Sequence, residues 1–164
     1  MTKPFSTSVS GAVIAIAASL LLGAPAFAAS TVHVKLTDSN VDAALVGDMG
    51  MNMNADMSKA VMFVTADVTT VPAGDVTFDV SNDATGFVHE MIVAKAPADG
   101  KPLPYDANED GVNEDAAGAL GEVSELKPGE AGSVTLTLDP GTYVLFCNVK
   151  GHYMAGMWTT ITVQ

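Results

Sequence analysis

Apolar and polar residues alternate along several short stretches of the chain, which is typical of strands that bury one face. The alternation is clearest in residues 31–37, 76–80 and 133–138, and Gly, Pro, Asn and Asp mark turns between the stretches. The pattern predicts strands at 31–37, 60–68, 76–80, 87–94, 122–126, 133–138, 143–146 and 158–163. Helix-period patterns do not exceed about two turns. We therefore expect an all-β chain folded as a Greek-key β-sandwich or barrel of about seven to eight strands.

The first 28 residues have a different pattern. Lys3 precedes an apolar stretch at residues 11–22, and Ala26-Phe27-Ala28 has the small-x-small form of a signal-peptidase site. The apolar stretch is shorter than the roughly 20 residues of a membrane span. We expect residues 1–28 to be a cleaved signal peptide, residues 29–164 to form the domain, and the periplasm to be the destination. An uncleaved anchor and an extracellular destination are the alternatives.

The net charge of the chain narrows the range of binding partners that it can have. The chain has 19 acidic and 7 basic residues, all of the latter lysine, for a formal net charge of −12. So acidic a surface repels nucleic acid and anionic lipid, and it attracts a basic protein partner. The same charge could simply keep the protein soluble. We expect a monomer with no nucleic-acid partner and no stable membrane insertion.

The chemistry concentrates near the C-terminus. The expected strand at 143–146 leads into Cys147, the only cysteine, and His152 and Met157 follow in a C-x4-H-x4-M arrangement. A lone cysteine in an exported protein cannot form an internal disulfide. Thiolate, imidazole and thioether on one short loop are ligands of a mononuclear copper electron-transfer site, which needs a second imidazole. His89, in the expected strand at 87–94, can supply it.

These motifs resemble those of the cupredoxins, the blue copper proteins. The spacing of the Cys147 loop is similar to that of the rusticyanin, auracyanin and sulfocyanin branches, and residues 71–82 followed by His89 match the family's strand, Asn and first ligand. The resemblance implies the same β-sandwich. It also implies one copper ion held by His89, Cys147 and His152, with Met157 rather than Met154 as a weak axial ligand. Because the protein occupies every ligand position, we do not expect an enzyme.

A periplasmic one-electron carrier is the function that the resemblance implies. A c-type cytochrome or a membrane-bound oxidase or reductase would be its redox partner. In the family, the C-terminal histidine reaches the surface within an apolar patch, which here would include Phe87, Tyr153, Met154 and Ala155. In many cupredoxins an asparagine after the first histidine ties the two ligand loops together. Glu90 stands there instead, and by alternation it is expected to point outward.

Three other features leave alternatives open. Met49, Met51 and Met53 would point the same way on an extended chain, where they could bind extra Cu(I) or simply fill gaps. This segment supports the alternative function, a periplasmic protein for copper resistance, storage or delivery. Residues 95–121 are expected to form a long acidic loop insertion. Within it, Asp106, Asn108 and Asp110 resemble half of a calcium loop, but Ala117 stands where the final acid should be. His33 is expected to be an exposed residue without a metal.

Overall fold

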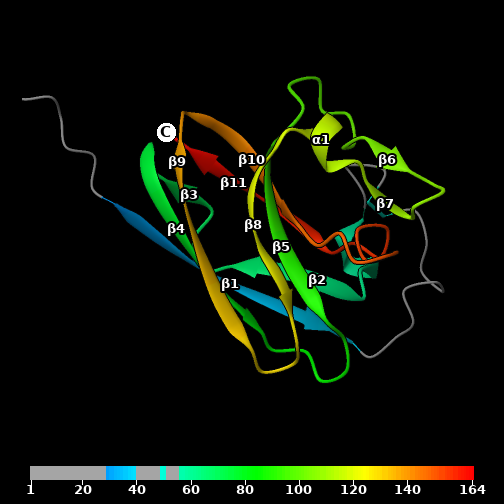
Figure 1. Ribbon diagram of the computed structural model, residues 1–164. Coiled ribbons are helices and arrows are strands. Elements are labelled where there is room, and N and C mark those ends of the chain that lie inside the picture. Colours follow the sequence, from blue (N-terminus) through cyan, green and yellow to red (C-terminus); the bar gives the residue numbers. More distant parts are fainter. Residues whose placement is uncertain (1–28, 40–48, 51–55) are drawn as a thin grey trace, which may run out of the picture.

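The structure, a computed structural model, describes residues 29–39, 49–50 and 56–164. Two β-sheets face each other, and a short hairpin with a one-turn helix covers one end (Figure 1). The first sheet has the strand order β2-β1-β4-β9 and the second has the order β3-β11-β10-β5-β8. The first sheet contains β1 (Ser30–Asp38), β2 (Met62–Ala66), β4 (Gly74–Asn82) and β9 (Ala131–Leu138).

The second sheet contains β3 (Thr70–Val71), β5 (His89–Lys95), β8 (Ala119–Leu126), β10 (Gly141–Phe146) and β11 (Trp158–Val163). Neighbouring strands are antiparallel, except that β1 runs parallel to β4 and β11 runs parallel to β3. The chain crosses between the sheets repeatedly, for example from β4 to β5 and from β9 to β10, as in a Greek key. All eight expected strands are present with small shifts at their ends, and the predicted β-sandwich is confirmed.

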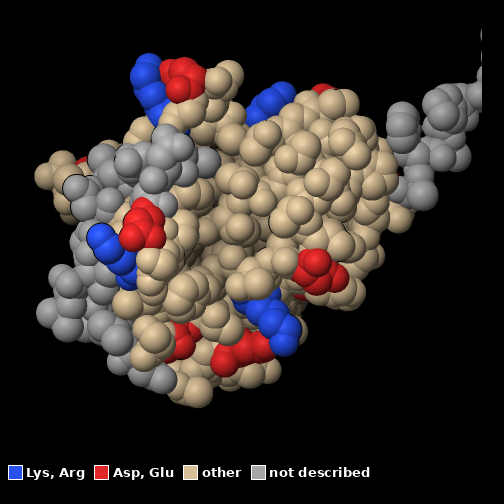
Figure 2. Space-filling view, turned by 180° about the vertical axis from the view of Figure 1, so that it is seen from behind, with Lys and Arg blue, Asp and Glu red and all other residues tan. Residues whose placement is uncertain are grey.

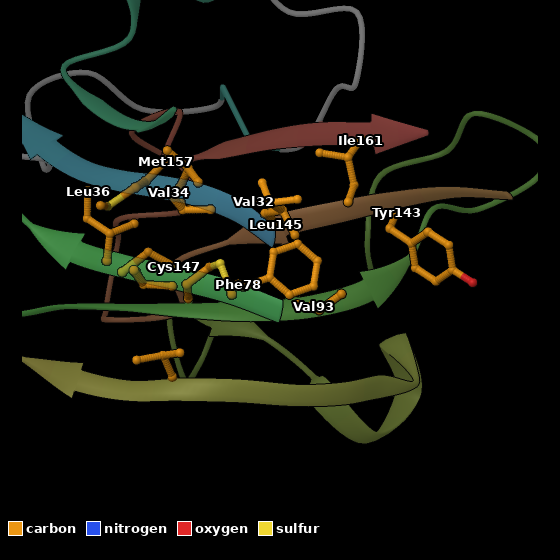
Figure 3. Close-up of a cluster of buried hydrophobic side chains, with 14 of the residues drawn as sticks. Val32, Val34, Leu36, Phe78, Val93, Tyr143, Leu145, Cys147, Met157 and Ile161 are labelled. Carbon is orange, nitrogen blue, oxygen red and sulfur yellow. The ribbon is translucent and has the colours of Figure 1, made fainter. Parts of the chain in front are cut away.

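The main core fills the space between the two sheets. On β1 the inward positions are Val32, Val34 and Leu36, and each is essentially inaccessible. They meet inward side chains of the opposite sheet such as Leu145 and Ile161 (Figure 3). This packing follows directly from the two-residue period of the sequence.

A second core lies on the outer face of the second sheet. Ile92 of β5 and Val144 and Phe146 of β10 point away from the main core and are nevertheless fully buried. These side chains are covered by residues 95–121, the segment that was expected to be a loop. That segment contains β6 (Tyr105–Asp106), β7 (Gly111–Val112), α1 (Glu114–Ala117) and the first residues of β8. Leu103 and Val112 pack against the sheet, so residues 95–121, predicted as a long loop, include two short strands and a helical turn that cover it.

Candidate metal centre

Three strand ends bring the predicted ligands together. Cys147 follows the last residue of β10, His89 is the first residue of β5, and His152 lies in the loop between β10 and β11. Strands β5 and β10 are hydrogen-bonded neighbours, with Ile92 opposite Phe146. The pairing therefore places the start of one strand beside the end of the other.

The donor atoms form a compact triangle. The Nδ1 atoms of His89 and His152 are 3.1 Å apart, and Cys147 Sγ lies 3.9 Å from the first and 3.5 Å from the second. A point in their plane is about 2 Å from all three atoms, close to normal metal–nitrogen and metal–sulfur bond lengths. The three residues are between 0 and 5% exposed. The site therefore fits a single copper ion, the metal that His2Cys sets with a weak thioether bind.

Burial keeps all three groups uncharged without metal. Removal from water raises the pKa of the Cys147 thiol to about 12. Removal from water, and secondarily the nearby His89, lowers the pKa of His152 to about 4. Burial also lowers the pKa of His89, although Asp38 opposes the shift. A metal cation supplies the positive charge that the thiolate needs.

The ligand loop is held closed by its own backbone. The Cys147 N–H donates to the carbonyl of Met157 at 3.0 Å, and the Met157 N–H donates to the carbonyl of His152 at 3.0 Å. Gly156 has a φ of +93°, and a Cβ there would lie 2.7 Å from the Cβ of Ala60. A larger residue would therefore be both strained and crowded at that position. These backbone bonds and the conformation of Gly156 together fix the course of the ligand loop.

The two methionines of the ligand loop, Met154 and Met157, lie in different cores. Met157 is inaccessible and belongs to the same core cluster as Cys147, and Figure 3 shows both among the core side chains. Met154 is only half-buried and packs against the second core. The structure thus brings His89, Cys147 and His152 together and places Met157, not Met154, in the core cluster that contains Cys147.

Glu90 points toward the ligand loop, contrary to the expectation that it points outward. Its Oε1 accepts a hydrogen bond from the backbone N–H of Asn148 at 3.1 Å, which joins the two ligand segments. Burial, followed by repulsion from Glu122 and Glu114, raises the pKa of Glu90 to about 7. The carboxyl group therefore takes the place of the family's asparagine as the link between the two segments.

Asp38 was missed by the sequence analysis. Its Oδ2 lies 3.5 Å from His89 Nε2, on the side of the ring away from the triangle, and both side chains are inaccessible. The alternation that buries Val34 and Leu36 also places position 38 inward. An acidic residue at an inward position of a strand was the signal that could have found it.

The expected apolar surface patch is smaller than predicted. Tyr153 and Ala155 are buried, and the Tyr153 ring lies between Tyr105 and Phe146, at centroid distances of 6.3 and 5.9 Å. Phe87 meets His152 edge to face at 6.1 Å and remains partly exposed, as does Met154. Tyr153 was assigned to the surface because the second core was not foreseen.

The remaining candidates lie apart from the centre. His33 is exposed, as predicted, and its Nδ1 is 3.7 Å from Asp79. Met49 is buried with its backbone bonded to Met154, in keeping with gap filling, whereas Met51 and Met53 lie outside the described residues. The acidic loop joins β6 to β7, and Asp110 there accepts a hydrogen bond from the Tyr105 hydroxyl. Calcium binding by that loop stays a prediction.

Comparisons with known proteins agree with this geometry. The family model described as copper binding proteins of the plastocyanin/azurin family matches residues 49–164. Auracyanin-B from Chloroflexus aurantiacus is 50% identical over 50 residues, which cover 30% of this chain but only 21% of that relative. The described residues include no helix long and apolar enough to cross a membrane.

Solved structures support the fold. An auracyanin B structure aligns with a TM-score of 0.50 and 26% identity, covering 86% of this chain and 92% of its own. Rusticyanin from Thiobacillus ferrooxidans aligns with a TM-score of 0.50 and 19% identity, over 82% of this chain and 78% of its own. The family model spans well over half of the chain and includes Cys147 and both histidines of the triangle. This protein belongs to the plastocyanin/azurin family of copper-binding proteins.

Proposed function

We propose that the protein is a type 1 copper protein that carries single electrons between redox proteins. His89, Cys147 and His152 would be the strong ligands and Met157 the weak axial one. The observation that carries the proposal is the buried triangle of donor atoms, which are spaced for one metal ion. Ligands fixed in this way suit electron transfer because little has to move when the charge of the metal changes.

Bound copper supplies the one-electron couple between Cu(I) and Cu(II). The chain's own residues hold its surroundings fixed: the backbone bonds between Cys147, His152 and Met157 close the loop, and Glu90 joins it to the strand that carries His89. With four protein ligands, no position is left for a substrate. We therefore infer a carrier and not an enzyme.

His152 is the ligand through which electrons would enter and leave. His152 is 5% exposed, whereas His89 is fully buried. Phe87, whose ring contacts that of His152, is partly exposed, and so is Met154, which follows in the same loop. A small apolar contact suits a short-lived encounter between redox proteins. The net charge of −12 favours a basic partner, such as a c-type cytochrome, or a membrane-bound oxidase or reductase.

One face of the molecule is poor in charged side chains near its middle. Figure 2 shows a face with a broad uncharged area, around which acidic and lysine side chains are scattered. A partner steered by long-range attraction can thus settle on an uncharged contact. A periplasmic location, after removal of residues 1–28, fits an exported chain with a single cysteine.

The test is a stepwise addition of Cu(II) to the mature metal-free protein, followed by visible spectroscopy. We expect an intense thiolate-to-copper charge-transfer band that saturates at one copper per chain and bleaches reversibly with a reductant. Cys147→Ala should lose the band, whereas Met154→Leu should keep it. Uptake of several copper ions without the band would contradict the proposal.

A further inference from the structure

We propose that Asp38 is a positioning residue for the copper centre, which presets the tautomer of His89 and favours Cu(II) over Cu(I). The inference rests on the proposed copper function and deepens it. It concerns a carboxylate that is not one of the four ligands and that lies on the far side of a ligand ring. Its basis is the 3.5 Å approach of Asp38 Oδ2 to His89 Nε2 with both side chains inaccessible.

The pair connects the two sheets of the sandwich. Asp38 ends β1 in the first sheet, and His89 begins β5 in the second. Because the rigid cores of both sheets fix these strand ends, the carboxylate cannot move away without disturbing β1. The contact therefore holds the imidazole ring from behind while its Nδ1 faces Cys147 and His152.

Hydrogen-bond chemistry then decides which ring nitrogen carries the proton. A carboxylate oxygen accepts hydrogen bonds, so a hydrogen bond across this 3.5 Å contact requires the ring proton to be on Nε2, the nitrogen that faces Asp38. The lone pair of a neutral His89 is consequently on Nδ1, the atom in the donor triangle. His152, which is slightly exposed, can exchange its ring proton with water, whereas the fully buried His89 depends on Asp38.

Charge gives Asp38 its second effect. A carboxylate in the protein interior is costly unless a positive charge lies nearby. A metal at the triangle provides that charge through the imidazole ring, and Cu(II) provides more of it than Cu(I). Carboxylate partners of metal-bound histidines are known to raise ligand basicity, and their removal typically costs about 10–100-fold in metal affinity. Asp38 should therefore lower the reduction potential of the site.

The chain contains a matched control in a second histidine–aspartate pair. His33 Nδ1 lies 3.7 Å from Asp79 Oδ2, but these side chains are 64% and 49% exposed. His33 lies on β1 and Asp79 on β4, and neither residue belongs to the donor triangle. Asp79→Asn changes the net charge by the same amount as Asp38→Asn without touching a ligand, so the two variants separate local from overall charge effects.

The experiment compares copper-loaded parent, Asp38→Asn and Asp79→Asn proteins. We expect Asp38→Asn to keep the charge-transfer band, because asparagine still offers an acceptor to Nε2. Its Cu(II) affinity, measured by competition with a chelator, should fall about 10–100-fold, with a smaller loss for Cu(I). Each tenfold difference between the two losses raises the potential by about 59 mV. Asp79→Asn should match the parent.

A measurement on the metal-free parent tests the tautomer independently of any variant. Nitrogen-15 NMR at neutral pH should show His89 protonated at Nε2 and unprotonated at Nδ1, and Asp38→Leu should disturb this state. Protonation at Nδ1 in the parent, or equal potentials for parent and Asp38→Asn, would overturn the inference. In either case a normal charge-transfer band in the parent would leave the proposed function standing, whereas a missing band would contradict that function itself.

Discussion

Burial sets the charge of each ligand before a metal arrives. Water is excluded from Cys147, His89 and His152, and all three are therefore held in their neutral forms near pH 7. The thiolate required for copper binding forms only when the cation is present to stabilise it. Metal binding is therefore coupled to proton release, and the number of protons released per metal ion can be measured.

We predict that binding of Cu(II) releases close to one proton per copper at pH 7. The proton comes from Cys147, whose pKa is about 12 without metal, while the histidines are already neutral because the pKa of His152 is about 4 and that of His89 is lowered. Calorimetry in buffers of different ionisation enthalpy measures the number. The value should stay near one from pH 7 to 8 on this account. Release near zero would mean that the thiolate exists beforehand.

The choice between the two loop methionines is also decided at this scale. Met157→Leu keeps the volume nearly constant, so we expect a stability cost below about 1.5 kcal/mol. The charge-transfer band should remain, and the potential should rise because Cu(II) loses an axial donor, by about 59 mV for each tenfold loss of relative Cu(II) affinity. Voltammetry of Met157→Leu against Met154→Leu measures the difference. A larger shift for Met154→Leu would reverse the assignment.

Spacing in the sequence identified the residues that form the triangle, but not those that support it. His89, Cys147 and His152 follow from residue types at set intervals and from the family resemblance. Asp38 and Glu90 are ordinary acidic residues whose roles depend on which strand end each one faces across the sandwich. Alternation along β1 could have shown that Asp38 points inward, but the residue that it meets there is a long-range contact, which leaves no local pattern in a single sequence.

At the scale of elements, the second core explains why part of residues 95–121 packs against the second sheet. Strands β5 and β10 are apolar on both faces, with Ile92 and Phe146 outward, and a strand with two apolar faces needs a cover on each side. The continuous apolar runs in these strands were visible in the sequence. The cover was not, because its strands β6 and β7 have only two residues each.

Asn148 fastens this cover to the ligand loop. Its Oδ1 accepts from the Val112 N–H at 2.6 Å, and its Nδ2 donates to the Val112 carbonyl at 3.0 Å and to Glu114 at 2.8 Å. Asn148→Ala would leave buried backbone groups of β7 without these partners. We predict a loss of about 2–4 kcal/mol in the free energy of unfolding, measured by urea denaturation of the metal-free protein.

Asn108→Ala is the matched control for this prediction. Asn108 is exposed, and among the described residues its side chain bonds only to Asp106 of the same loop. Its removal should change the free energy of unfolding by less than about 0.5 kcal/mol. Equal effects of the two substitutions would show that the cover is not fastened through Asn148.

For the whole molecule, the net charge of −12 should govern encounters with small redox reagents. We predict that a cationic ruthenium ammine complex exchanges electrons with the copper-loaded protein faster at low salt than at high salt. An anionic iron cyanide complex should show the opposite dependence, because salt screens attraction in the first case and repulsion in the second. Stopped-flow rates between about 10 mM and 500 mM salt test this, and identical salt slopes for both reagents would refute it.

The fold as a whole was predictable because it depends on alternation and turns, which are local.

The central claim is that this fold holds one copper ion through a full redox cycle. Voltammetry of the protein loaded with one equivalent of copper tests this claim most directly. The copper content is measured before and after cycling in the presence of a Cu(I) chelator. The account predicts a single reversible one-electron wave and no loss of copper. Irreversible reduction with transfer of copper to the chelator would contradict it and indicate copper delivery instead.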